Sequence, residues 1–381
     1  MIRVGALVKP SDLPSETANG AYASNAVLLM HMAASYGVEL CLFSHRDIDL
    51  ENNSVNGLFL KDGAFRRHKV PIPPIIDNKV YVRRTDKALR EKTNALKKRS
   101  YFTRIVTNFA KWGQYVRLVS DSEFSGVAIP TILINKDFAL DDLFANLGND
   151  LILKPENSSG GRGIVKVKRL DENYSVIKDD ATEEFMTPVG LRSYIAELQA
   201  TRYLAQTNVH STTPSGRPFD IRIYAQRKGE DSHAYVMYPR IGAGKILSCP
   251  AAISNYIPLD TFLEENFGHV AKDMRQALET FAQTFPPYFQ KFLSHPFFDI
   301  VFDVGIESVN GSFRLWLFKV RQFPSFGFKN HPGELHLEIA QATLEYYKHI
   351  YLTLTGDRGE TEQDEPSSFR SINEKRRIWD S

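Results

Sequence analysis

The feature that most constrains the fold is a glycine-rich loop between two apolar runs, at residues 150–167. The stretch reads "DLILKPENSSGGRGIVKV", in which the first run ends at Lys154 and the second begins at Ile164. This pattern predicts a β-hairpin. Glycines at its tip let backbone amides approach a ligand closely, and serines add donors. A lysine beside such a loop suits a polyphosphate, and the alternative is a plain surface hairpin with a flexible tip. The loop is not of the Walker type, because no GK[ST] opens a helix here.

Size and composition restrict the class of protein. The chain has 381 residues, 43% of them hydrophobic, and a formal net charge of +2, which is typical of a globular protein with two or three lobes. The low net charge argues against nucleic acid or an acidic membrane as a partner. Cys41 and Cys249 form neither a disulfide framework nor a zinc pattern. No apolar run approaches the ~20 residues that span a bilayer, and a strand begins at once, so we expect no signal peptide and a cytoplasmic protein.

The first hundred residues alternate strands and helices. The sequence predicts strands at 2–8 and 38–44, helices at 21–36 and 86–100, and a further strand within 69–84. This order predicts a Rossmann-like parallel domain over residues 1–100. No GxGxxG follows the first strand, so we expect no dinucleotide site.

From about residue 101 the pattern changes to antiparallel strands with fewer helices, so the fold class is α/β and α+β. Strands are expected at 203–209, 219–227, 233–241, 297–307 and 314–323, and helices at 101–121, 191–200, 257–284 and 335–354. The helix at 257–284 should end before Pro286 and Pro287. The turn before the last strand is expected at 308–313, and the polar tail at 356–381 should be mobile.

Charged pairs lie on two of these strands. Lys319 and Arg321 alternate with apolar residues and therefore point the same way, roughly 7 Å apart. They require an anion between them, or they pair with Asp299, Asp303 or Glu307. Asp220 and Arg222 share one face of the strand at 219–227, where the arginine either clamps a phosphate or carboxylate or forms an ordinary cross-strand ion pair.

The order of these motifs resembles the ATP-grasp superfamily, and within it the YheC/YheD-type (endospore coat-associated) proteins. The matching segments are "FAKWGQY", "KPENSSGGRGI", "QTNV", "GRPFDIRIYAQ", "PRIGAG" and "DVGIESVNGSFRLWLFKVR". The likeness covers most of residues 1–355. It implies a pre-ATP-grasp Rossmann-like domain at 1–100, an ATP-grasp small lobe with the glycine-rich loop at 101–206, a large lobe at 207–355, and a tail at 356–381.

The resemblance also implies roles for individual residues. Lys111 and Lys154 would contact the ATP phosphates, Arg222 and Arg240 would face the transferred phosphoryl group and the acyl substrate, and Asp303 would be a magnesium ligand. Residues of the loop would fold over the phosphates: Ser158, Ser159, Gly160, Gly161 and Gly163. A strand end would hold the adenine: Gln206, Thr207, Asn208 and Val209.

The last strand departs from the family pattern, which places glutamate and asparagine there as further magnesium ligands. This chain has Lys319 and Arg321 instead, and a cation cannot ligate magnesium, which binds oxygen donors. Either these two cations bind the ATP phosphates directly, or the metal site is lost and the fold serves binding alone.

The function that the resemblance implies is an ADP-forming carboxylate ligase that works through an acyl phosphate. Its cofactors would be ATP and Mg²⁺, and its product an amide or a thioester. Its partners would be a small-molecule carboxylate, such as an amino acid, and for the thioester an acyl carrier protein, as in antibiotic or other specialised biosynthesis. The alternative is a non-catalytic, degenerate ATP-grasp protein with a structural or binding role in the spore coat.

Overall fold

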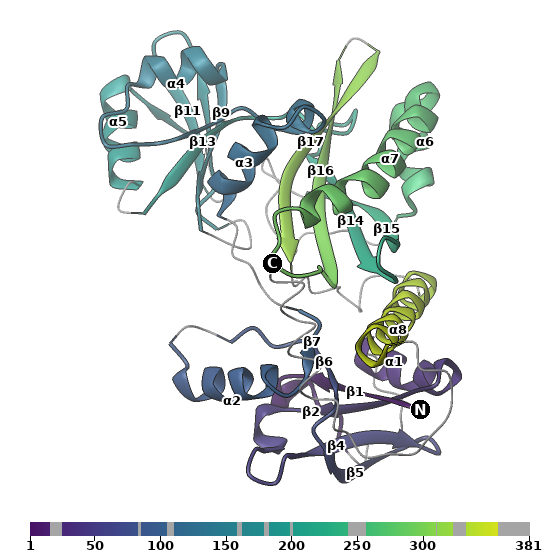
Figure 1. Ribbon diagram of the computed structural model, residues 1–381. Helices are drawn as coiled ribbons and strands as arrows, with labels where there is room; N and C mark the ends of the chain where they lie inside the picture. The colour runs from purple at the N-terminus through teal and green to yellow at the C-terminus, as the bar shows by residue number, and fades with distance from the viewer. Residues whose placement is uncertain are drawn as a thin grey trace.

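The computed structural model describes ten segments of the chain and divides them among three β-sheets (Figure 1). The described segments are residues 1–15, 25–82, 85–104, 110–157, 162–178, 183–198, 201–242, 257–309, 311–322 and 333–356. Mixed α/β architecture with antiparallel sheets, as the sequence predicts, is confirmed. The tail expected at 356–381 lies outside the described residues, apart from Gly356.

The first sheet is mixed and belongs to the N-terminal part of the chain. Its order is β3-β4-β2-β1-β6-β7, with β5 paired to β4; β1 is parallel to β2 and β6, and β6 is parallel to β7. The strands are β1 Ile2–Leu7, β2 Val38–Phe43, β3 Ile48–Asp49, β4 Ser54–Lys61, β5 Ala64–Pro71, β6 Ile75–Asn78 and β7 Tyr101–Phe102. The expected boundary at residue 100 falls just before β7, and the Rossmann-like assignment stays a prediction.

Helices cover both faces of this sheet, and one of them comes from the far end of the chain. Helices α1 (Asn25–Ala33) and α8 (Gly333–Thr355) pack together on one face, as Figure 1 shows. Helix α2 (Lys87–Lys97) contributes Leu96 to the core of the other face. The helix expected at 21–36 begins at Asn25 in the described residues and ends at Gly37, whose φ of 71° makes it a left-handed stop.

The second sheet forms the small lobe in the middle of the chain. Its order is β12-β11-β10-β9-β13-β8, and helices α4 and α5 supply its core with Leu143, Phe144 and Leu191. The strands are β8 Thr131–Leu133, β9 Asp150–Pro155, β10 Val165–Arg169, β11 Tyr174–Lys178, β12 Glu183–Met186 and β13 Tyr203–Thr207, and the helices are α4 Leu140–Leu147 and α5 Pro188–Leu198. The antiparallel pair β9–β10 confirms the hairpin expected at 150–167.

The third sheet forms the large lobe and is antiparallel, in the order β15-β14-β16-β17. Its strands are β14 Phe219–Arg227, β15 His233–Ile241, β16 Asp299–Val309 and β17 Ser312–Gln322. One face packs on helices α6 (Leu259–Phe267) and α7 (Ala271–Gln290), and also receives Leu118 from helix α3 (Lys111–Val119). The opposite face carries polar residues, together with Tyr224 and Val301, which pack on α8.

Short 3-10 helices lie at Pro10–Asp12, Ala34–Tyr36, His45–Asp47, Ser125–Val127 and Gly268–Val270. No helix in the described residues is both long enough and apolar enough to cross a membrane.

Two helix predictions are wrong. The helix expected at 257–284 is interrupted at Gly268, whose φ is 54°, and α7 continues through Pro286 to Gln290. Proline removes the amide that would bond the carbonyl of Ala282, and His233 Nε2 lies 2.9 Å from that oxygen instead. In the segment expected to be helical at 101–121, Tyr101–Phe102 is strand β7 and the helix begins at Lys111; residues 105–109 lie outside the described part.

The turn expected at 308–313 is also too wide, because β16 runs to Val309 and β17 starts at Ser312. The pairing of the two strands is irregular further along. Asp303 faces Lys319 and the next residue, Val304, faces Leu317, so Phe318 forms a β-bulge. Lys319 and Arg321 follow the bulge and alternate regularly, as the sequence predicts.

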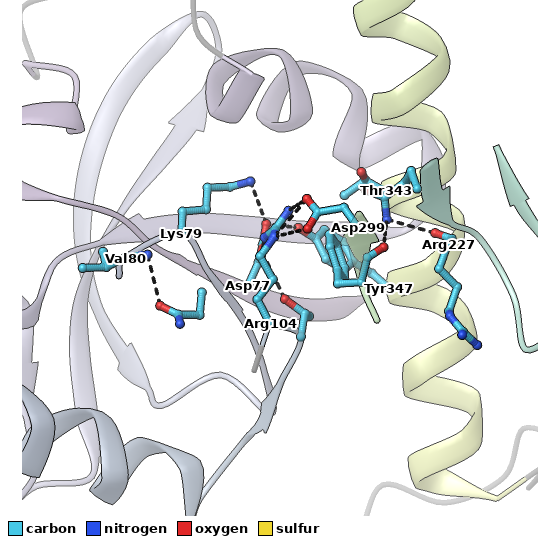
Figure 2. A network of polar contacts seen from close by, with 12 residues as sticks. Asp77, Lys79, Val80, Arg104, Arg227, Asp299, Thr343 and Tyr347 are labelled. Carbon is cyan, nitrogen blue, oxygen red and sulfur yellow. Dashed lines mark hydrogen bonds and ion pairs between the residues drawn. The ribbon is translucent and has the colours of Figure 1, made fainter. Parts of the chain in front are cut away.

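A buried polar cluster joins the first sheet to the large lobe (Figure 2). Arg104 forms ion pairs with Asp77 of β6 and with Asp299 of β16, at 2.7 Å between Nη2 and Oδ2 for the latter. The hydroxyl of Tyr347 in α8 donates to Asp77 at 2.6 Å, and that of Tyr224 in β14 donates to Asp299 at 2.8 Å. Four separate elements thus meet at one guanidinium, which fixes the N-terminal part against the sheet that carries Asp303.

Candidate functional site

Three lysines from three elements line one narrow cleft between the small and large lobes. They are Lys111 at the start of α3, Lys154 near the end of β9, and Lys319 after the bulge in β17. The volume of this cleft that is open to the centre of a water molecule is about 30 Å³. The sequence singled out all three residues, and the structure brings them together.

Hydrogen bonds hold two of the ammonium groups in place. Lys111 Nζ donates to the carbonyls of Pro155 and Glu156, at 2.6 and 3.1 Å. Lys154 Nζ donates to Gln206 Oε1 at 2.6 Å, and Gln206 Nε2 donates to Thr131 at 2.7 Å. These acceptors are neutral oxygens, so the hydrogen bonds position the charges without neutralising them.

Burial and the neighbouring lysines lower the pKa values of Lys111 and Lys154. Burial, followed by the charges of Lys111 and Lys319, lowers the pKa of Lys154 to about 7. Burial and then the charge of Lys319 lower the pKa of Lys111 to about 8, with Glu156 acting the other way. Like charges in a desolvated cleft disfavour each other, and an anion placed among them would relieve that cost.

The same cleft has an apolar side. Tyr115 of α3, Leu204 of β13, and Leu317 and Phe318 of β17 line it alongside the lysines. A cleft with a cationic side and an apolar side matches a ligand that carries both phosphates and a flat base.

Asp303 lies beside the cleft within a compact group of two arginines and two aspartates. Arg222 donates to both of its carboxylate oxygens, at 2.8 and 3.0 Å. Arg240 lies 2.8 Å from Asp303 Oδ2, and its Nε donates to Asp220 at 2.7 Å. Two positive and two negative charges cancel here. Asp220 and Arg222 therefore form cross-strand ion pairs, as one of the two alternatives predicts, but with other partners: Asp220 pairs with Arg240, and Arg222 pairs with Asp303.

The pKa values of the two carboxyl groups shift in opposite directions. Burial tends to raise the pKa of Asp303, but Arg240 and Arg222 outweigh it, so that pKa lies below its usual value. Burial raises the pKa of Asp220 to about 6, with Arg240 opposing and Asp303 adding to the rise. Asp303 therefore stays ionised between its arginines.

The three acids considered as partners for Lys319 and Arg321 all have other partners, and the charge of Arg321 also acts on Asp303. Asp299 binds Arg104 and Asp303 binds Arg222 and Arg240. Glu307 accepts from Trp316 Nε1 at 3.0 Å and from the amide of His210 at 3.1 Å. Lys319 lines the cleft, and it is the residue of β17 that pairs with Asp303 on the neighbouring strand β16.

Of the four residues expected to hold adenine, the structure brings Gln206 into the cleft. The amides of Thr207 and Asn208 donate to the carbonyls of Pro130 and Asp150, at 3.0 and 2.9 Å. The Thr207 hydroxyl donates to Leu147, and the Asn208 amide group donates to the Asp150 carboxylate. Thr207, Asn208 and Val209 continue from β13 toward the large lobe, and their contact with adenine stays a prediction.

The tip of the glycine-rich hairpin, with Ser158, Ser159, Gly160 and Gly161, lies outside the described residues. Gly163 is described, with a φ of 74°, and a Cβ there would lie 2.9 Å from Tyr203 Oη. That hydroxyl donates to the Gly163 carbonyl at 3.1 Å. Only glycine fits this close approach, so the position is fixed by backbone geometry.

The described residues fit a magnesium ion poorly. Magnesium needs several oxygen donors in octahedral geometry, and no group of three or more acidic, histidine or cysteine residues gathers in the described part. Both oxygens of Asp303 accept from arginines, and Lys319 stands across from it. Asp303 as a metal ligand stays a prediction.

Sequence reasoning missed Gln114, Tyr115, Thr131 and Phe318, which also line the cleft. Gln114 and Tyr115 follow Lys111 by three and four residues. That spacing puts them on the same helix face, so it could have revealed them. Nothing in the sequence predicts the β-bulge at Phe318, so it does not reveal that this side chain lines the cleft.

Comparisons with known proteins identify the family of the chain. Residues 101–350 match the family described as YheC/D like ATP-grasp. The endospore coat-associated protein YheD of Bacillus subtilis (strain 168) is 23% identical over 335 residues, which cover 83% of this chain and 70% of that protein.

Two solved structures are also similar. D-cycloserine synthetase DcsG has a TM-score of 0.46 and 11% identity, covering 91% of this chain and 99% of that one. N5-carboxyaminoimidazole synthetase from Staphylococcus aureus, complexed with ADP, has a TM-score of 0.46 and 9% identity, covering 89% and 77%. The family match spans well over half of the chain, and the resemblance seen in the sequence is confirmed: this chain belongs to the YheC/D-like ATP-grasp family.

Proposed function

We propose that the protein binds ATP in the lysine-lined cleft and uses it as an ADP-forming carboxylate ligase. The observation that carries this proposal is the convergence of Lys111, Lys154 and Lys319, with the pKa values of Lys111 and Lys154 lowered by burial and then by neighbouring lysines. A triphosphate is the anion that such a site favours. Membership of an ATP-grasp family supports the same ligand.

In this proposal the two walls of the cleft have different roles. Lys111 and Lys154 bind the phosphates from the side of the glycine-rich loop, and Lys319 and Arg321 bind them from β17. The apolar side with Tyr115 takes the base.

The reaction follows from charge placement and needs no side-chain nucleophile. An oxygen of the substrate carboxylate attacks the γ-phosphorus, the bond to the bridging oxygen breaks, and ADP leaves with an acyl phosphate formed. An amine or thiol then displaces inorganic phosphate, loses its proton and gives an amide or thioester. Lys319 and Arg321 would stabilise the transferring phosphoryl group, and Arg222 and Arg240 would face the acyl group.

The proposed substrate is an amino acid or similar small carboxylate, and the proposed acceptor is an amine or the thiol of an acyl carrier protein. A free-standing ligase of this kind would fit antibiotic or other specialised biosynthesis. Mg²⁺ would supply further charge neutralisation when bound, but the described residues favour cationic side chains for that task.

The test is unfolding temperature with and without ATP, each with and without Mg²⁺. ATP at 100 times its dissociation constant should stabilise the protein by roughly 2.7 kcal/mol. A shift that is independent of magnesium supports neutralisation by side chains. ADP release is then measured with single amino acids and with carrier proteins. No thermal shift under any of these conditions removes the proposal.

A second candidate function is ATP binding without catalysis, in a coat or assembly role like the one that the name of YheD suggests. The observation that favours it is the neutral group of Asp303 and its arginines, which leaves Arg222 and Arg240 already paired. ATP stabilisation without ADP release for any carboxylate and acceptor pair would select this function. Turnover with one pair would select the ligase.

A further inference from the structure

The side chain of Gln114 connects α3 to the outer edge of β17. Its Nε2 donates to the carbonyl of Val320, and the amide of Val320 donates to its Oε1, both at 3.4 Å. β17 is the last strand in the order β15-β14-β16-β17, so within the described residues no strand pairs with its outer side. The carboxamide gives one residue of this edge the two bonds that a neighbouring strand would give.

The position of this contact matters because Val320 lies between Lys319 and Arg321. Gln114 itself lies three residues after Lys111, on the same face of α3. The contact therefore links the helix that carries Lys111 to the strand that carries Lys319.

Without an anion, the lysines repel each other, and burial adds to the cost of their charges. Repulsion alone would drive α3 away from β17. We propose that Gln114 is a positioning residue that holds α3 against β17, so that Lys111 and Lys319 stay converged while the cleft is empty. This proposal rests on the proposed ATP site and deepens it, since it explains how an anion site is preformed.

The ammonium of Lys111 also donates to the carbonyls of Pro155 and Glu156, and other contacts hold neighbouring parts of this segment. Tyr288 Oη donates to the carbonyl of Arg117 at 3.3 Å. Arg314 of β17 donates to the carbonyl of Gly126, beyond the end of α3, at 2.8 Å. These contacts keep the segment folded if Gln114 is replaced, so the first turn of α3 is the part that should loosen.

The experiment compares Gln114→Met, which removes both bonds at similar volume, with Gln114→Glu, which keeps an acceptor for the Val320 amide and removes the donor to its carbonyl. The control is Gln283→Met in α7, whose amide bonds Tyr235 Oη at 3.3 Å on an exposed surface. Each protein is studied by hydrogen exchange of the α3 amides without nucleotide, and by calorimetric titration with ATP at about pH 7 and about pH 9.

We expect Gln114→Met to speed exchange of the amides at positions 114 and 115 and to weaken ATP binding roughly tenfold, with the control unchanged. Gln114→Glu should weaken ATP binding at least as much, because it also adds a negative charge to the cleft. We also expect the pH dependence of ATP binding to become flatter in Gln114→Met. The pKa values of the lysines should return toward their usual range when Lys111 moves away from Lys319. A variant that only loses general stability would not change this pH profile.

Unchanged exchange and unchanged ATP affinity in Gln114→Met would overturn the inference. If the wild-type protein does not bind ATP at all, the proposed function fails. The exchange measurement on the nucleotide-free protein then still decides whether Gln114 holds α3. If Gln114→Met does not fold, Gln114→Glu provides both measurements.

Discussion

Lys154 carries its charge in surroundings that oppose it. Its ammonium bonds the neutral oxygen of Gln206, and burial with two neighbouring lysines lowers its pKa to about 7. In the free protein at neutral pH, a large fraction of Lys154 is therefore deprotonated. Bound phosphates would favour the protonated form, so binding should take up a proton.

The first prediction concerns the pH dependence of ATP binding. From about pH 7 to about pH 9, affinity should fall by about tenfold or more, because Lys154 and then Lys111 lose their protons in the free protein. Lys154→Arg keeps its charge throughout this range and should flatten the profile. Calorimetry in buffers of different ionisation enthalpy measures the proton uptake, and a flat wild-type profile would contradict the prediction.

At the scale of elements, the structure shows which parts of the fold the sequence determines. The strands at 219–227 and 233–241 agree with the observed β14 and β15, because alternation and a polar turn are local signals. The predicted end of the helix at 257–284 was wrong because His233, a residue far away in sequence, bonds the carbonyl that Pro286 leaves without an amide. The order of the motifs was enough to single out the lysines of the cleft. The bonds between Gln114 and Val320 and the ion pairs of Asp303 depend on tertiary packing, which the sequence does not reveal.

A prediction at this scale concerns His233, which supports the proline-containing part of α7. His233→Ala leaves the Ala282 carbonyl without this contact and should cost about 1–3 kcal/mol. Burial lowers the pKa of His233, so the unfolded chain takes up a proton first as the pH falls. The stability from neutral His233 is complete above about pH 6.5 and is lost below it.

Urea unfolding at several pH values measures both effects. The exposed His269, replaced by alanine, is the control. Equal loss of stability in His233→Ala and His269→Ala would contradict the role given to His233.

Another element-scale prediction concerns the bulge in β17. A Cβ on Gly305 would lie 2.8 Å from Cε1 of Phe318, so Gly305→Ala should destabilise the protein by about 1–3 kcal/mol and displace Phe318 from the cleft. Gly113→Ala in α3 meets nothing within 4 Å and should stabilise by about 0.5–1 kcal/mol. Chemical denaturation measures both, and a neutral Gly305→Ala would show that the bulge yields easily.

At the scale of the whole molecule, the cluster around Arg104 unites the N-terminal part, the large lobe and α8. Arg104→Met leaves the fully buried carboxylates of Asp77 and Asp299 without their shared cation. The expected loss in the free energy of unfolding is about 3–5 kcal/mol. Arg275→Met, which breaks exposed pairs with Asp260 and Glu279, is the matched control and should cost less than about 1 kcal/mol. Urea unfolding compares them, and equal losses would rule out a special role for the buried cluster.

The packing of α8 on the first sheet has a consequence for biosynthesis. Ala340, Leu344 and Tyr347 complete a core that comes, apart from α8 and Phe298, from the first third of the chain. A ribosome therefore releases the strands of that sheet long before the helix that shields them. Until translation reaches the last helix, the nascent chain exposes an apolar surface, and a message cut short before residue 333 would yield a product prone to aggregate.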